Sequence, residues 1–124
     1  MIKEVHIKIV PQSKIRNHDC GDYWFDDNVL QIRVVELPEY SHTMLIAIHE
    51  LVEAFMTDYQ GIKEEDINKF DADFYLEKVC GSHAEEDEPG FDNRACYRDH
   101  HTLCTAIEMM ICSFLKISWK DYNG

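Results

Sequence analysis

The chain has 124 residues and a formal net charge of −12, so we expect one domain, residues 1–124, with one modest hydrophobic core. The acidic balance argues against binding to a nucleic-acid backbone, because such binding requires a basic surface. No apolar run reaches the roughly 18–20 residues that span a bilayer, so we expect a cytoplasmic protein without membrane contact.

The first third of the chain predicts a small β-sheet. Residues 5–10 alternate between apolar and polar side chains and end at Pro11, as expected for a strand. Residues 29–35 alternate in the same way, and residues 23–25 are expected to form a shorter strand before a turn at Asp26-Asp-Asn28. We therefore expect an antiparallel hairpin or sheet in this region.

Helical patterns dominate the remainder of the chain. The first predicted helix opens with Pro38 in its first turn or Ser41 as its cap, and it should end near Tyr59, before Gly61. Further helices are predicted over residues 64–79 and 97–115, with a last short turn over 119–122. The predicted fold class is α+β, with the sheet packed on about three helices.

The first predicted helix carries charge where a buried helix should be apolar. Between Met44 and Met56 every residue is apolar except His49, Glu50 and Glu53. A helix that is apolar on nearly all sides is normally buried, and a buried carboxylate needs a charged partner or a metal. His49 and Glu53 are four residues apart and therefore lie on one face of the helix. Their spacing predicts two ligands for one metal ion.

The H-E-x-x-E pattern resembles the H-E-x-x-H motif of zinc enzymes, with Glu50 at the position of the general base. A metal needs a third ligand, and the third helix offers His101 and Glu108 on one face. His49, Glu53 and His101 would form a set of two histidines and one carboxylate. Glu108 is expected either as a fourth ligand or as a group that orients His101. The predicted cofactor is zinc or another divalent metal.

Other interpretations of these residues remain open at this point. His100 is an alternative to His101, and Glu53 on a solvent-facing side would leave His49 as an ordinary core histidine. A site for Mg²⁺ or Mn²⁺ would instead use oxygen ligands. Its ligands would be Glu50, Glu53, Asp71 and Glu108. The five cysteines form no C-x-x-C pair, and Cys104 and Cys112 fit a helical core as small apolar residues.

A second functional class follows from the charge. Acidic residues cluster at Glu64-Glu-Asp66 and Glu85-Glu-Asp-Glu88. Solvated surface segments explain such runs in the simplest way. Together with the net charge, they are also typical of a non-catalytic protein that binds the basic surface of a host factor.

The order of these motifs resembles a group of small uncharacterised proteins encoded by bacteriophages and prophages. The resemblance covers most of residues 28–122 and implies a phage setting more than a mechanism. It rests on His49-Glu-Leu-Val-Glu53-Ala, Phe70-Asp71, Glu88-Pro-Gly-Phe-Asp92, Tyr97, His101, Thr105-Ala-Ile-Glu108 and Trp119-Lys-Asp-Tyr122.

A strand that leads into this helix also resembles the minimal core of zincin metallopeptidases. Zincins carry a second histidine where this chain has Glu53, and the additional negative ligand makes the metal a weaker Lewis acid. The sequence therefore predicts a small metal-binding protein of phage type that acts as a zinc-dependent, metallopeptidase-like hydrolase. The alternative prediction is an acidic protein that binds a host factor in the cytoplasm.

Overall fold

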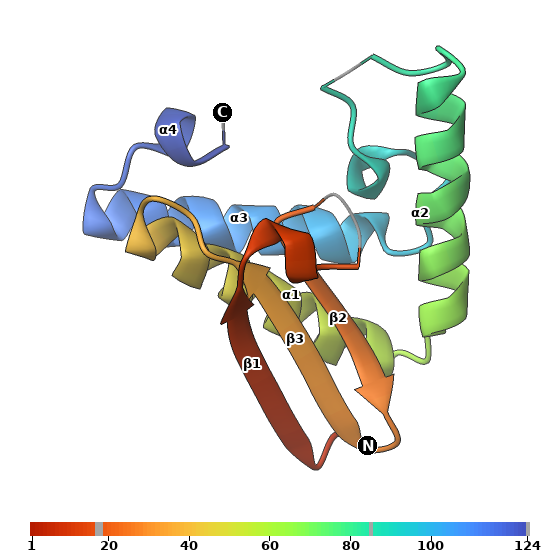
Figure 1. Cartoon of the computed structure of the whole chain (residues 1–124), viewed down its shortest axis with the longest axis horizontal. Helices are drawn as coiled ribbons and strands as arrows, with labels where there is room; N and C mark the ends of the chain where they lie inside the picture. The colour runs from red at the N-terminus through yellow and green to blue at the C-terminus, as the bar shows by residue number, and fades with distance from the viewer. Residues whose placement is uncertain (17–18, 85, 124) are drawn as a thin grey trace.

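Three strands come first along the chain and the helices follow (Figure 1). The structure is a computed structural model that describes residues 1–16, 19–84 and 86–123. The strands are β1 (Glu4–Val10), β2 (Gly21–Asp26) and β3 (Val29–Val35). The helices are α1 (Tyr40–Tyr59), α2 (Glu64–Val79), α3 (Arg98–Leu115) and the short α4 (Trp119–Asn123), and the 3₁₀ turns are η1 (Gln12–Lys14) and η2 (Pro89–Phe91). The predicted α+β class is confirmed.

The sheet is mixed, so the prediction of a purely antiparallel sheet is wrong. Its strand order is β1-β3-β2; β2 and β3 are antiparallel, whereas β1 runs parallel to β3. The cause is the chain path. The tight turn at Asp27, where φ is 55°, pairs β2 directly with β3, and β1 pairs with the other edge of β3. Strands β1 and β2 run in opposite directions, so β1 on the other side of β3 is parallel to it.

One face of the sheet forms the main core. Leu30, Ile32 and Val34 of β3 have no exposed side-chain surface, and they cluster with Ala47 and Ala54 of α1. Strand residues two apart share a face of the sheet, and this apolar set lies on the face that α1 covers. The other face is polar, and there Trp24 lies close to the guanidinium groups of two arginines. The alternation that predicted the strands therefore also predicted which face is buried.

Helix α1 covers one face of the sheet, and the other long helices lie beyond it. Helix α1 packs against β2, β3 and α3, and α2 stands at the side of the molecule opposite β1 (Figure 1). Helix α1 begins after Glu39, so neither Pro38 nor Ser41 occupies the predicted starting position; the Thr43 hydroxyl instead accepts the Leu37 N–H at 2.9 Å. Within the described ranges, no helix is both long and apolar enough to span a membrane.

Candidate metal centre

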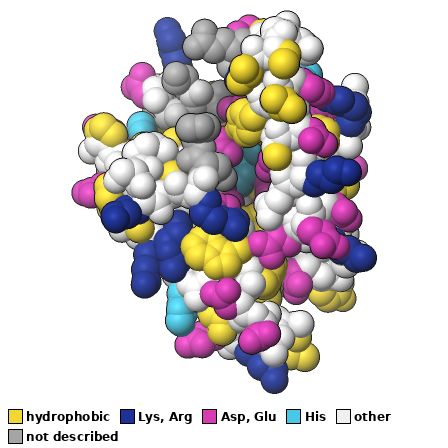
Figure 2. Space-filling view, turned by 45° about the vertical axis from the view of Figure 1, so that its right-hand side comes forward, with side chains coloured by type: hydrophobic (Ala, Val, Ile, Leu, Met, Phe, Trp, Pro, Cys, Tyr) yellow, Lys and Arg dark blue, Asp and Glu magenta, His cyan; other side chains and the backbone are white. Residues whose placement is uncertain are grey.

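A cavity of about 460 Å³ opens between β2, α1, α2 and α3, and its walls are strongly acidic. Figure 2 shows acidic and histidine side chains within a central hollow of the molecule. Among the described residues, no Lys or Arg lines it, so its potential favours a cation. The ionisable lining residues, cysteine and tyrosine aside, are Asp19, Asp22, Glu50, Glu53, Glu64, Asp71, Glu88, Glu108, His49 and His101.

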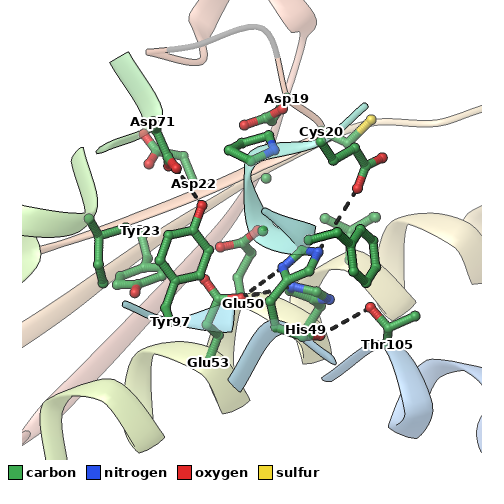
Figure 3. Close-up of a pocket in the computed structure, with 18 of the residues that line it drawn as sticks. Asp19, Cys20, Asp22, Tyr23, His49, Glu50, Glu53, Asp71, Tyr97 and Thr105 are labelled. Carbon is green, nitrogen blue, oxygen red and sulfur yellow. Dashed lines mark hydrogen bonds and ion pairs between the residues drawn. The ribbon is translucent and has the colours of Figure 1, made fainter. Parts of the chain in front are cut away.

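Glu53 of α1 contacts one histidine on its own helix and one on α3. Its Oε2 lies 3.1 Å from Nε2 of His49, on the same face of α1, and 3.2 Å from Nδ1 of His101 on α3 (Figure 3). The Glu53 side chain is only 8% exposed, so it does not face bulk solvent. Two ligands on tetrahedral zinc, each about 2.0–2.1 Å from the ion, stand roughly 3.3 Å apart. These separations therefore suit hydrogen bonds or a shared metal equally.

Glu108 serves His49 and not His101, the histidine that the sequence suggested it would orient. Its carboxylate pairs with Nδ1 of His49 and accepts a hydrogen bond from the Tyr122 hydroxyl of α4. An imidazole that binds metal through one nitrogen usually donates its other N–H to a carboxylate. Glu108 occupies that supporting position, which leaves Nε2 of His49 directed at Glu53.

Cys104 adds a donor that sequence reasoning assigned to the core alone. It is 1% exposed, and its Sγ, a nitrogen of His49 and an oxygen of Glu53 all lie within 4.8 Å of one another. This group could hold a metal ion. The signal in the sequence was spacing, because Cys104 follows His101 by three residues and therefore shares its face of α3.

His101 is held by the segment that precedes α3. A Cβ on Gly90 would come within 2.5 Å of the His101 ring, and the Phe91 ring stands edge-on at a centroid distance of 4.8 Å. Its neighbour His100 instead bonds through Nε2 to Gln60 at 2.6 Å, outside the cavity lining. The choice of His101 over His100 therefore agrees with the direction of the two rings.

Glu50 enters the cavity beside β2. A Cβ on Gly21 would lie 2.7 Å from Glu50 Oε1, so the missing side chain of this glycine makes room for the carboxylate. Burial raises the pKa of Glu50 well above its ordinary 4.5, and the negative charge of Glu53 raises it further, although His49 opposes the shift. A carboxyl group that holds a proton inside a cavity is suited to acid–base chemistry.

His49 and Glu53, which face each other in the cavity wall, carry opposite charges. Burial alone lowers the pKa of His49, but its bonds to Glu108 and Glu53 outweigh burial and raise the pKa to about 10. Burial raises the pKa of Glu53, yet hydrogen bonds from His101 and His49 bring it down to about 2. The proton that His49 holds therefore offsets the negative charge of Glu53 and Glu108. A divalent cation bound at this place would replace that proton.

Asp71 forms a separate contact on the wall that α2 contributes. The Tyr97 hydroxyl donates a hydrogen bond to its Oδ1 (Figure 3). Burial raises the pKa of Asp71 to about 6, although the bond from Tyr97 acts in the opposite direction. The structure gives Asp71 no described bond to Glu53 or the histidines, so it lines the cavity as a distinct group.

Comparison with protein-family models, curated proteins and solved structures finds no match for the chain.

Proposed function

We propose that the protein is a metal-dependent hydrolase whose metal is held between α1 and α3. The observation that carries the proposal is the convergence of His49 and Glu53 with His101 and Cys104 at the wall of an acidic cavity. Side chains from two helices meet there, which a chance H-E-x-x-E pattern does not require. The phage setting and the zincin-like layout remain part of the proposal.

Zinc suits this donor set best. Imidazole nitrogen, thiolate sulfur and carboxylate oxygen are its usual ligands, whereas Mg²⁺ and Mn²⁺ prefer oxygen alone. Of the carboxylates that an oxygen-only site would use, Glu108 pairs with His49 and Tyr122, and Asp71 with Tyr97. We therefore assign His49, Glu53 and His101 as ligands, with Cys104 as a further donor and Glu108 as support for His49.

The chemistry divides between the metal and the protein. A divalent ion held by these ligands supplies Lewis acidity to a substrate carbonyl or phosphoryl oxygen. The positive charge of that ion would favour the ionised form of Glu50, which takes a proton from the attacking water at its carboxylate and returns it to the leaving group. Glu108 keeps the His49 ring oriented through Nδ1, and the cavity has room for a small substrate or a single side chain.

The test uses two isosteric variants on one helix. Purified protein should contain about one equivalent of zinc per chain. Glu53→Gln should lose the metal, because its Oε2 faces both histidines. Glu50→Gln should keep the metal and lose hydrolysis of peptide or ester substrates. Metal content is measured by elemental analysis, and fold by circular dichroism.

The opposite results would reject the proposal. Wild-type protein with less than about 0.2 equivalents of any transition metal, and no loss of thermal stability on chelation, would reject the metal centre. A Glu50→Gln variant with full hydrolytic activity would reject the role of Glu50. The acidic, host-factor-binding alternative would then be favoured, and a salt-sensitive partner captured equally well by Glu50→Gln would support it.

A further inference from the structure

Exposure of apolar side chains changes abruptly across the sheet. Leu30, Ile32 and Val34 of β3 are 0% exposed. Their register partners on β1, which share the same face of the sheet, are 41–52% exposed. These partners are Val5, Ile7 and Ile9. An apolar row therefore continues the core face beyond the edge of the core.

The cause is the position of α1, which packs against β2 and β3 and leaves β1 beside it. The outer backbone edge of β1 is also unpaired within the described residues, because β3 is its only partner strand. The opposite sheet edge is treated differently: the Phe25 N–H of β2 donates to Glu64 of α2 at 3.3 Å. A free strand edge beside an apolar row is a template for another strand.

We propose that a second copy of this chain covers β1, with the two β1 strands paired antiparallel around a two-fold axis at His6. Closed two-fold dimers are the most common assemblies, and a two-fold axis normal to the sheet produces this antiparallel pairing. The product is one continuous six-stranded sheet with both α1 helices on the same face. The apolar rows of the two β1 strands meet between those helices.

The charges on β1 select this register. With His6 opposite His6 of the second copy, each Glu4 faces a Lys8, and each Val5 faces an Ile7 on the apolar side. Opposite charges directly across an antiparallel pair stabilise it, and like charges destabilise it. A register centred on Ile7 would instead place Lys8 opposite His6 and leave Glu4 opposite Val10. The register at His6 is the one that pairs Glu4 with Lys8, and it also places an apolar pair, Val5 and Ile7, on the other face.

The overall charge does not oppose this contact. Helix α2 lies on the side of the molecule away from β1 (Figure 1), and no residue of β1 lines the acidic cavity. Glu4 and Lys8 balance each other in charge on the strand itself. A foreign strand could occupy the edge, but the chain supplies both halves of the Glu4–Lys8 match. A second copy is therefore the occupant that the residues specify.

Sedimentation equilibrium on the full chain tests the proposal. Wild-type protein should have twice the monomer mass of 14.6 kDa. Glu4→Lys places lysines opposite lysines, and Lys8→Glu places glutamates opposite glutamates, so each variant alone should raise the dimer dissociation constant at least about tenfold. A mixture of the two variants should dimerise again, because both pairs between positions 4 and 8 in the mixed dimer are then opposite in charge.

Two further variants guard against misinterpretation. Ile7→Lys should also give monomers, whereas Val79→Lys, at a position 85% exposed at the end of α2, should leave the dimer intact. Circular dichroism confirms that each variant is folded. Wild-type protein that stays monomeric at about 100 μM would overturn the proposal. A dimer that Glu4→Lys does not weaken, or variants that fail to rescue each other, would overturn it as well.

Discussion

The two halves of the candidate metal centre have similar side chains, but different parts of the fold hold them in place. Helix α1 contributes His49, Glu50 and Glu53, and α3 contributes His101, Cys104 and Glu108. The α1 half rests on the sheet: Gly21 closes over Glu50, and the Tyr23 hydroxyl lies 3.3 Å from the buried hydroxyl of Thr57, one turn beyond Glu53.

The α3 half depends instead on two short elements. Gly90 of η2 packs on the ring of His101, and Tyr122 of α4 holds Glu108. Short elements with few buried contacts open more readily than core strands. The comparison indicates a candidate centre with one half fixed by the core and another half held by short elements that open more readily.

The largest difference in the free energy of unfolding is expected between His49→Ala and His101→Ala. Removing His49 leaves Glu53 and Glu108 buried without their shared imidazole, so the free energy of unfolding should fall by about 3 kcal/mol. Removing His101 leaves Glu53 paired with His49 and should cost about 1 kcal/mol. Urea unfolding in the presence of a chelator measures both losses without metal. Equal losses would contradict the division into a half fixed by the core and a half held by short elements.

The two glycines provide a second comparison. Gly21→Ala should cost about 2 kcal/mol of stability, because the new Cβ meets Glu50 and Ile46 between the sheet and α1. Gly90→Ala should cost less stability, since η2 lies in a loop, but it displaces the His101 ring and should weaken zinc binding about tenfold. Thermal unfolding and a zinc competition assay separate these effects. Unchanged zinc affinity in Gly90→Ala would place His101 outside the ligand set.

Most of the fold was predictable because its signals are local. The alternation of apolar residues located β1 and β3, and the long apolar periodicities located α1 and α3. The direction of β1 was not predictable from its own residues, because it depends on the hairpin that follows. Nor is α1 buried on all sides, as its composition suggested: Phe55 is 55% exposed on a side that no described element covers.

Prediction of the candidate site from the sequence was limited in the same way, because local spacing does not fix how the helices pack against each other. Helical spacing alone placed His49 and Glu53 together, and it placed His101 on the facing helix. Spacing placed Cys104 on the same face of α3 as His101, but it could not separate a metal ligand from a small core residue, because a buried cysteine in an apolar helix fits both. The partner of Glu108 was equally hidden, since it depends on the axial offset between α1 and α3.

Cys104 and Cys112 form a matched pair within α3, because both are buried and free and lie two turns apart. With Co²⁺ bound in place of zinc, a thiolate ligand gives a charge-transfer band in the near ultraviolet. Cys104→Ser should abolish that band and weaken metal binding about tenfold, whereas Cys112→Ser should change neither. Absorption spectra of the two cobalt-loaded variants measure this difference. A band retained in Cys104→Ser would show that another cysteine supplies the sulfur, and no band in the cobalt-loaded wild type would show that the metal is held without sulfur.

Substitution of Asp71 should have the smallest effect on stability, and this residue belongs to neither half of the candidate metal centre. Its pKa in the folded protein is about 6, raised from the ordinary 3.8 mainly by burial, so the folded chain holds this proton more tightly than the unfolded chain does. Its contribution to stability is therefore complete below about pH 4 and is lost as the pH rises through about 6.

Asp71→Asn keeps this position neutral at every pH. The stability of the variant relative to wild type should therefore increase by about 1 kcal/mol between pH 4 and pH 7, a value reduced because the side chain is partly exposed. Urea unfolding at several pH values in chelator measures the difference, and subtraction of the wild-type curve removes the contributions of Glu50 and the histidines. Parallel curves for the two proteins would show that Asp71 ionises normally. A stability difference that changes with pH in chelator would assign this pH dependence to Asp71 on the α2 wall, independently of the metal ligands on α1 and α3.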